Sequence, residues 1–277
     1  MPPKSRLGQN FLVDQQAIRR IVAAAGDCSN RTVVEIGPGR GAITRELAAK
    51  TAHLIALEVD PELAERLSSA LDPAVHGRAP SNVRIERIDV LAFDFAAAAA
   101  AAGQNLIVVG NLPYYITSPI LLKLAENCDV LDRAVLMVQR EVADRVTAAP
   151  GSRDYGLLTV TVQLHGRVEQ LFTLPPRAFS PPPEVHSTVF RWQFAPRFQE
   201  LDLDRERFLS FLKQVFALKR KTLANNLRAA GFGAGTIATA LHASGIDAKA
   251  RAEALPVETL AGLWRGLKNE GLLRQAN

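Results

Sequence analysis

A short apolar run that leads through a stiff loop into a helix is the feature of this sequence that most constrains its fold. Leu106–Val109 is rich in β-branched residues and lacks polar alternation, which is typical of a strand buried on both faces. The loop Gly110–Tyr114 follows, and Ser118 and Pro119 predict the N-cap and the first residue of a helix. In open α/β sheets built from such units, ligands bind at the carboxyl ends of the strands. We therefore expect the loop to lie at a ligand-binding edge.

This loop offers two hydrogen-bond acceptors beside a flat aromatic face. Asn111 presents an amide oxygen and Leu112 a backbone carbonyl, while Pro113 stiffens the backbone. Tyr114 supplies the aromatic ring. Two acceptors next to a stacking surface suit a planar amine with two N–H groups, such as the exocyclic amine of adenine. Taken alone, the same residues also fit an ordinary strand-to-helix turn whose tyrosine belongs to the core.

A second apolar run, Thr32–Gly37, leads into a turn with glycines at Gly37, Gly39 and Gly41. Glycines at this place allow a ligand to approach the backbone closely. Dinucleotide-binding proteins use the spacing Gly-x-Gly-x-x-Gly instead, and Pro38 lacks an N–H group that would donate to a pyrophosphate. The turn therefore favours a nucleoside ligand without phosphates.

Two carboxylates end the next two predicted strands, His53–Asp60 and Val83–Asp89. Glu58 stands where a carboxylate accepts the hydroxyl groups of a ribose, and Asp60 is expected to cap the following helix. Asp89 suits the amino group of an adenine as an acceptor, and it suits the cap of a turn equally well. Its place at a third carboxyl edge favours the binding role.

The remaining apolar runs before residue 195 predict further strands of the sheet, one helix and a rigid connector. A strand is expected at Ala134–Val138, a helix at Gln139–Val146, and an antiparallel pair of strands at Leu157–Phe172 and Val185–Phe194. The connector between the last two is dense in proline, so it is rigid and would hold Phe179 in a fixed place.

The composition changes at Ala195 and Pro196, after which apolar residues recur at helical spacing. We therefore predict two domains, residues 1–195 and residues 196–277. The chain has a net charge of +5, and residues 195–277 hold 13 basic and 8 acidic residues, so the preceding part is neutral. This excess favours a polyanionic partner, although a solvated basic face is the ordinary alternative. The basic residues expected to face outward are Lys219, Arg220, Lys221 and Arg228.

Several classes of protein are disfavoured. Cys28 and Cys128 are the two cysteines, and their spacing does not suit a metal site. No apolar run approaches membrane-spanning length, and the first six residues are not followed by the apolar segment of a secretory signal. The expectation is a cytoplasmic protein with no metal site and no membrane partner.

Together the motifs resemble a class I methyltransferase that uses S-adenosylmethionine (SAM). More closely, the sequence resembles the ribosomal RNA adenine dimethyltransferase family, and the matching segments occur in the expected order along nearly the whole chain. These segments are Gly8–Leu12, Glu35–Gly39, Asn111–Tyr114, Gln139–Ala143, Phe179–Pro183 and Arg220–Leu223. The resemblance implies an α/β, Rossmann-like fold with a seven-stranded, mostly parallel sheet and an antiparallel last strand. It also implies a small all-α C-terminal domain.

The resemblance also implies roles for individual residues. The target adenine would stack on Tyr114 and be closed from its other face by Phe179, while Asn111 and Leu112 accept its amino hydrogens. Tyr115 stands where other members carry asparagine, which implies a different pocket wall and the same substrate. SAM, which becomes S-adenosylhomocysteine, would be held by Asn10, Leu12, Gly37, Glu58, Asp89 and Asn111.

The branch that this sequence resembles most dimethylates N6 of two adjacent adenines near the 3′ end of small-subunit rRNA. The implied substrate is a pre-ribosomal 30S particle, and the enzyme is expected to act as a monomer. Other members methylate a large-subunit adenine and confer macrolide resistance. A non-catalytic RNA-binding assembly factor is an alternative of another class. An NAD-dependent oxidoreductase is disfavoured by the glycine spacing.

Overall fold

The structure is a computed structural model that describes residues 10–71 and 81–269, so the predictions for Gly8 and Gln9 lie outside it. The chain divides into two compact units, Met1–Ala143 with Gly166–Ala195 and Asp144–His165 with Pro196–Asn277. The division after residue 195 coincides with an edge of these units. The compact units nevertheless differ from the predicted domains 1–195 and 196–277, because the segment 144–165 groups with the helical unit.

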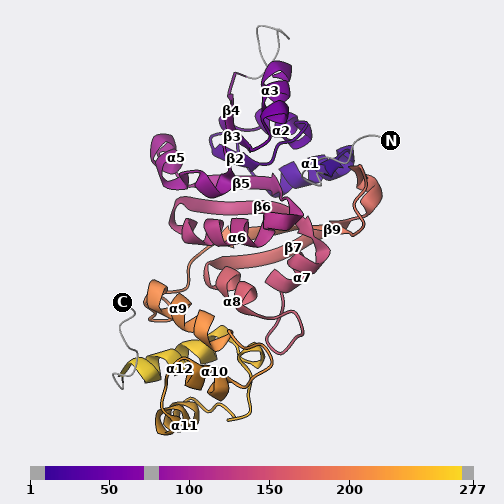
Figure 1. Ribbon diagram of the computed structural model, residues 1–277. Coiled ribbons are helices and arrows are strands. Elements are labelled where there is room, and N and C mark those ends of the chain that lie inside the picture. Colours follow the sequence, from indigo (N-terminus) through magenta and orange to yellow (C-terminus); the bar gives the residue numbers. More distant parts are fainter. Residues whose placement is uncertain (1–9, 72–80, 270–277) are drawn as a thin grey trace. The chain divides into compact units, whose positions relative to one another are not determined.

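Among its described residues, the first unit contains a seven-stranded sheet with the order β4-β3-β2-β5-β6-β9-β7 (Figure 1). In this sheet β9 runs opposite to the other six strands, so the predicted arrangement is confirmed. All residues of β2 are buried, as expected for a parallel strand covered on both faces. The strands are β2 (Thr32–Ile36), β3 (His53–Glu58), β4 (Val83–Arg87), β5 (Leu106–Asn111), β6 (Leu131–Gln139), β7 (Gly166–Leu174) and β9 (Ser187–Phe194).

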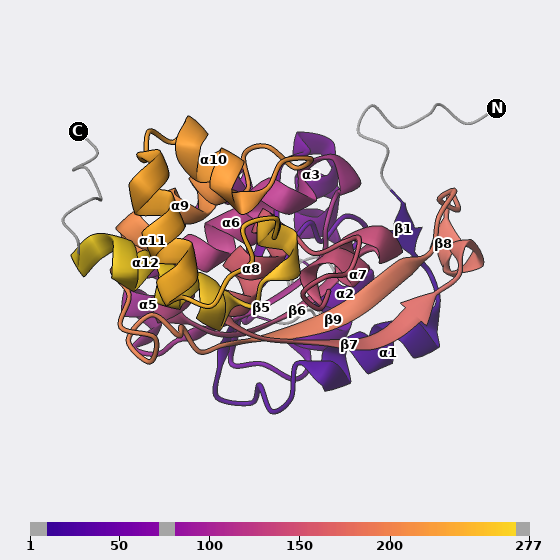
Figure 2. The same ribbon diagram turned by 90° about the horizontal axis from the view of Figure 1, so that it is seen from below.

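Helices connect these strands and cover the sheet, with α1 and α6 on opposite sides of it (Figure 2). The apolar residues of α1 and α2 form one core with alternate residues of the central strands, such as Val33, Ile107 and Val135. Asp14 caps α1, and Asp60 caps α3 as predicted. The helices are α1 (Gln15–Ala24), α2 (Ala42–Ala48), α3 (Pro61–Ala70), α5 (Phe95–Ala102), α6 (Thr117–Glu126) and α7 (Arg140–Val146), with 3₁₀ turns at Val90–Ala92, Tyr114–Ile116, Cys128–Val130 and Pro176–Ala178.

A second, two-stranded sheet joins the beginning of the described chain to the proline-dense connector. Strand β1 (Phe11–Leu12) pairs antiparallel with β8 (Phe179–Ser180), and Leu12 lies opposite Phe179 (Figure 2). Both Leu12 and Phe179 are buried in the core that contains α1. This pairing brings together two segments that are far apart in the sequence.

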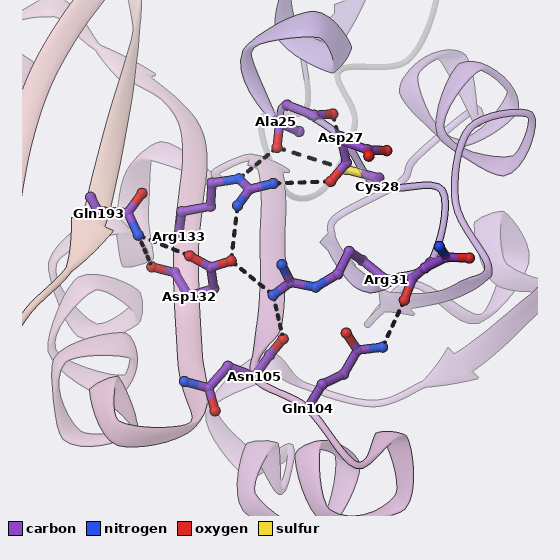
Figure 3. Close-up of polar contacts among 11 residues, drawn as sticks. Ala25, Asp27, Cys28, Arg31, Gln104, Asn105, Asp132, Arg133 and Gln193 are labelled. Atoms are coloured by element: carbon purple, nitrogen blue, oxygen red, sulfur yellow. Dashed lines mark hydrogen bonds and ion pairs between the residues drawn. The ribbon is translucent and has the colours of Figure 1, made fainter.

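The amino ends of the strands are closed by a polar network (Figure 3). Asp132 forms ion pairs of 2.8 Å with both Arg31 and Arg133, and it accepts a hydrogen bond of 2.8 Å from Gln193. Arg31 also donates to the carbonyl of Asn105 at 2.9 Å. Burial opposes the ionisation of Asp132, but the hydrogen bonds from Gln193 and Arg31 prevail and lower its pKa. The network ties β2, β5, β6 and β9 together at the edge opposite the glycine turn.

Two predicted elements were wrong in part. Helix α6 begins at Thr117 rather than after a Ser118 cap, because the Thr117 hydroxyl donates to the Pro113 carbonyl at 2.9 Å and starts the turn earlier. The segment Leu157–Leu164 is the helix α8 and not the first half of a long strand. Most of its residues are buried, so the apolar run has no polar face to reveal a helical period.

The second unit is helical and has its own core. Tyr155, Val160 and Leu164 pack with the apolar faces of the later helices, which explains why residues 144–165 group with them. Trp264 and Phe208 lie at the centre of this core, with ring centroids 5.8 Å apart. In addition to α8, the helices of this unit are α9 (Arg205–Val215), α10 (Leu223–Ala229), α11 (Ala234–Ala243) and α12 (Val257–Asn269), with a 3₁₀ turn at Ala252–Ala254.

Candidate active site

A cavity of about 410 Å³ lies at the carboxyl ends of the strands in the first unit. Its size is within the range of small-molecule sites in proteins. The structure brings eight of the nine predicted cofactor and adenine residues to this cavity, and these are Asn10, Leu12, Gly37, Glu58, Asp89, Asn111, Leu112 and Tyr114. The ninth, Phe179, does not line it.

The glycine turn forms one wall of the cavity. Gly37 and Gly39 have φ angles of +67° and +56°, a region that favours glycine over residues with a Cβ atom. A Cβ on Gly39 would also meet the ring of Phe11 at 3.1 Å. Both positions therefore require glycine for their conformation, and Gly39 also requires it for space.

Glu58 joins the glycine turn to the end of β3. Its Oε2 accepts a hydrogen bond of 3.0 Å from the Gly39 N–H, and its Oε1 accepts one of 3.0 Å from the Asp60 N–H. Burial raises the pKa of Glu58, and these backbone hydrogen bonds oppose the rise in part. Each carboxylate oxygen has a second lone pair, so the group can also accept hydroxyl groups of a ligand.

Asp89 serves as a turn cap and also lines the cavity. Its Oδ1 accepts a hydrogen bond of 2.9 Å from the Leu91 N–H, which confirms the capping interpretation. No described residue donates to its Oδ2. That oxygen is an acceptor at the cavity wall.

Glu35 is a cavity residue that the sequence analysis missed. It is 1% exposed on β2, and its Oε2 has no hydrogen-bond partner among the described residues. Burial raises the pKa of Glu35 to about 8, with Thr44 opposing the rise and the charge of Glu58 adding to it. A charged residue inside the apolar run Thr32–Ile36 was the signal that could have revealed it.

The loop after β5 is fastened on both sides. The Asn111 side-chain amide donates to the Asn10 carbonyl at 3.1 Å, and the Leu112 N–H donates to the Met137 carbonyl at 2.9 Å. No described residue donates to Asn111 Oδ1 or to the Leu112 carbonyl. Both acceptors remain available to a planar amine in the cavity, as the sequence predicts.

The two tyrosines that follow are placed differently. Tyr114 is partly buried, and its hydroxyl oxygen lies 2.9 Å from the hydroxyl oxygen of Ser187. Tyr115 also lines the cavity, but it is 58% exposed. Tyr114 is thus a fixed aromatic wall, whereas Tyr115 lies at the exposed margin of the cavity.

Nearly the whole chain matches a protein family. Residues 3–267 match the model of the family described as ribosomal RNA adenine dimethylase. The chain belongs to the ribosomal RNA adenine dimethylase family. The ribosomal RNA small subunit methyltransferase A of Acidobacterium capsulatum is 56% identical over 266 residues, which cover 96% of this chain and 92% of that protein. The protein with the same name from Koribacter versatilis is 47% identical over 276 residues, covering 96% and 94%.

Solved structures show the same fold. A dimethyladenosine transferase from Plasmodium falciparum superposes with a TM-score of 0.79 at 22% identity, covering 94% of this chain and 98% of that one. The 23S rRNA methyltransferase ErmE superposes with a TM-score of 0.70 at 26% identity, covering 94% and 100%. Both matches extend over nearly all of this adenine dimethylase chain.

Phe179 lies in the core of this family member rather than at the cavity. It is 4% exposed and packs in the core around α1, beneath the pairing of β1 with β8. Its stacking on the adenine stays a prediction.

The four basic residues of the dimethylase that were expected to face outward lie on the second unit. Lys219, Arg220 and Lys221 are exposed in the loop between α9 and α10, and Arg228 is exposed on α10. The buried Asn226 side chain holds this loop, since its Oδ1 accepts a hydrogen bond of 2.8 Å from the Leu218 N–H. The buried Asn226 side chain thus fixes the backbone at Leu218, directly before the three exposed cations.

Two kinds of site are not found in the part of the dimethylase that the structure describes. No group of three or more His, Cys, Asp or Glu side chains could hold a metal ion there. No helix between residues 10 and 269, apart from the gap at 72–80, has the length and apolar character needed to cross a membrane.

Proposed function

We propose that this protein transfers methyl groups from SAM to N6 of two adjacent adenines near the 3′ end of small-subunit rRNA during ribosome assembly. The observation that carries the proposal is the pair of acceptors at Asn111 and Leu112, held at the edge of the cavity by contacts with Asn10 and Met137. Membership of the adenine dimethylase family supports the reaction. Relatives of up to 56% identity that are named for the small subunit support the substrate.

The lining of the cavity supports SAM as its ligand. Carboxylates line the cavity at Glu58 and Asp89, and Gly37 lines it beside them. The Glu35 carboxyl group has an oxygen without a partner among the described residues. We propose that SAM is held by Asn10, Leu12, Gly37, Glu58, Asp89 and Asn111. When bound, SAM supplies a methyl group that its sulfonium already activates, so no metal ion is needed.

The protein's part in the chemistry is to hold the two N6 hydrogens. The lone pair of an adenine amine is delocalised into the ring, so the amine is a poor nucleophile. Asn111 Oδ1 and the Leu112 carbonyl would accept both hydrogens and favour a pyramidal, more nucleophilic nitrogen as positive charge develops. Their fastening to Asn10 and Met137 means that little reorganisation is needed at that moment. The cation formed on N6 is acidic and loses its proton to water without a strong base.

The adenine must leave its stack to enter the cavity, which costs a few kcal/mol. Stacking on the ring of Tyr114 returns about 1–3 kcal/mol of this. After the first transfer one N6 hydrogen remains, so the site must accept a methyl group beside one of the two acceptors. Phe179 would close the other face of the base.

The basic residues are the proposed contacts for rRNA phosphates. Lys219, Arg220, Lys221 and Arg228 are exposed, and the excess positive charge of the chain lies in the region that contains them. The proposed partner is a pre-ribosomal 30S particle, recognised in part by shape. The proposed setting is the cytoplasm, with the protein acting as a monomer.

The test is to incubate the purified protein with radiolabelled SAM and small subunits that lack this methylation, and then to map the modified bases. We expect dimethylation of two adjacent adenines. Large subunits serve as the second substrate, because ErmE, at 26% identity, is named for 23S rRNA. Methylation of large subunits alone would overturn the substrate assignment.

A further inference from the structure

The ring of Tyr114 is held through its hydroxyl group. This hydroxyl oxygen lies 2.9 Å from the hydroxyl oxygen of Ser187, and burial raises the pKa of the phenol while this bond lowers it in part. No other described side chain or backbone group is hydrogen-bonded to the Tyr114 hydroxyl. One contact therefore determines where the far end of the ring lies.

Ser187 is itself rigidly placed. It is fully buried as the first residue of β9, where it lies opposite Gln139 of β6 and Leu174 of β7. The backbone of Ser187 is thus fixed between two strands of the main sheet. Tyr114, by contrast, begins a short 3₁₀ turn outside the sheet. The bond connects this short turn to the rigid sheet.

The neighbouring tyrosine shows that this turn does not fix every ring. Tyr115 follows in the same 3₁₀ turn, is 58% exposed, and has no hydrogen-bond partner for its hydroxyl among the described residues. The turn alone therefore leaves an aromatic side chain in solvent. What distinguishes Tyr114 is the buried hydroxyl of Ser187.

We propose that Ser187 is a positioning residue for methyl transfer, because it sets the plane of the Tyr114 ring on which the target adenine stacks. This inference rests on the function proposed above. The stacked base must present its amine to Asn111 Oδ1 and the Leu112 carbonyl together, so a tilt of the ring displaces the amine from both acceptors. Small errors of this kind lower the rate of the chemical step more than the affinity for the substrate.

The chain offers a matched control in the next residue. Thr188 is buried on the same strand, and its hydroxyl oxygen lies 2.9 Å from that of Thr173. Successive residues of a strand point to opposite faces, so this second hydroxyl pair has the same length without facing Tyr114. Thr188 is buried like Ser187, while its partner Thr173 is exposed. Loss of the Thr188 hydroxyl reports what a buried hydroxyl contributes to the fold alone.

The experiment compares Ser187→Ala, Tyr114→Phe, the double variant and Thr188→Ala, with kcat and KM measured on undermethylated small subunits at saturating SAM. Ser187→Ala and Tyr114→Phe should each lower kcat about threefold to tenfold, the effect of one hydrogen bond, with KM for the subunit within about twofold. The double variant should be no slower than the slower single variant, because both remove the same bond. Thr188→Ala should keep the kcat of the unmodified protein.

The result that overturns the inference is a Ser187→Ala protein with unchanged kcat, or a double variant whose loss equals the product of the two single losses. If Ser187→Ala fails to fold by circular dichroism, Tyr114→Phe decides alone, and an unchanged kcat there overturns the inference. An unmodified protein that methylates neither subunit would overturn the proposed function instead.

Discussion

The side-chain amide of Asn111 donates a hydrogen bond of 3.1 Å to the backbone carbonyl of Asn10, 101 positions earlier in the chain. A carbonyl can only accept, so the amide nitrogen must face Asn10 and the amide oxygen must face away from it. The contact therefore decides which end of Asn111 a ligand meets. Because the amide nitrogen of Asn111 is used by Asn10, its Oδ1 remains as an acceptor that faces away from Asn10.

Replacing Asn111 with alanine should abolish methyl transfer, with kcat reduced at least about 100-fold, because one of two acceptors for the developing charge is removed. Affinity for the small subunit should remain within about twofold, since the proposed phosphate contacts are elsewhere. The check is single-turnover methylation beside a filter-binding measurement of RNA affinity. Unchanged methylation would contradict the role of this amide.

Glu58→Gln should weaken SAM binding at least about tenfold, measured by calorimetry. The buried carboxylate accepts from both Gly39 and Asp60, and an amide can offer only one accepting oxygen to these two donors. The matched control is Glu62→Gln, which removes an exposed carboxylate from the first turn of α3. Equal affinities of the two variants would show that Glu58 does not shape the cofactor site.

The buried carboxyl group of Glu35 should make stability fall as pH rises. Its pKa is about 8 in the folded protein against an ordinary value of 4.5, so the native state keeps its proton between these values while the unfolded chain releases it. This contribution is present in full below pH 4.5 and is lost as the pH rises towards 8. Its size is on the order of 3–5 kcal/mol.

In Glu35→Gln this dependence should disappear. Urea unfolding at pH 5 and pH 8 should show a smaller loss of stability for the variant than for the unmodified protein. Glu65→Gln, at an exposed position of α3, should keep the original pH dependence. An identical slope in all three proteins would mean that Glu35 does not hold its proton in the folded state.

Changing Lys219, Arg220 and Lys221 together to glutamine should weaken RNA binding and lessen its dependence on salt. Removing one phosphate-binding cation lowers the slope of log K against log salt concentration by about 1, so a reduction of about 2 to 3 is expected for the triple variant. The control removes three exposed charges elsewhere, at Lys50, Lys249 and Arg251. Equal slopes for both triple variants would place the phosphate-binding residues on another surface.

The strand ends and the cavity residues could be predicted because local chemistry determines them. Buried parallel strands require continuous apolar runs, and the glycine turn and Pro113 have few alternative conformations. Helix α8 could not be told from a strand, because most of the run Leu157–Leu164 is buried and none of it is exposed. The placing of residues 144–165 depends on a core assembled from distant helices, which no local pattern shows.

The positions of Phe179 and Glu35 illustrate the same limit within the site. Phe179 is withdrawn into the core by the pairing of β1 with β8, a contact between segments that no local pattern in the sequence links. Glu35 stands out in the sequence as a charged residue in an apolar strand, but only the structure shows that this strand residue lines the cavity. The predicted residues of the loop after β5 line the cavity, whereas the positions of Phe179 and Glu35 depend on what packs around them.

The contact between Tyr114 and Ser187 spans 73 positions, and the pairing of β1 with β8 joins the start of the described chain to the proline-dense connector just before Ser187. Contacts between such distant residues form only after the intervening chain is available. A growing polypeptide in which Ser187 has not yet left the ribosome therefore contains the glycine turn and the loop after β5. It cannot yet form the hydrogen bond that holds the Tyr114 ring. The Tyr114 ring therefore reaches the position proposed for full activity only after β9 has been synthesised.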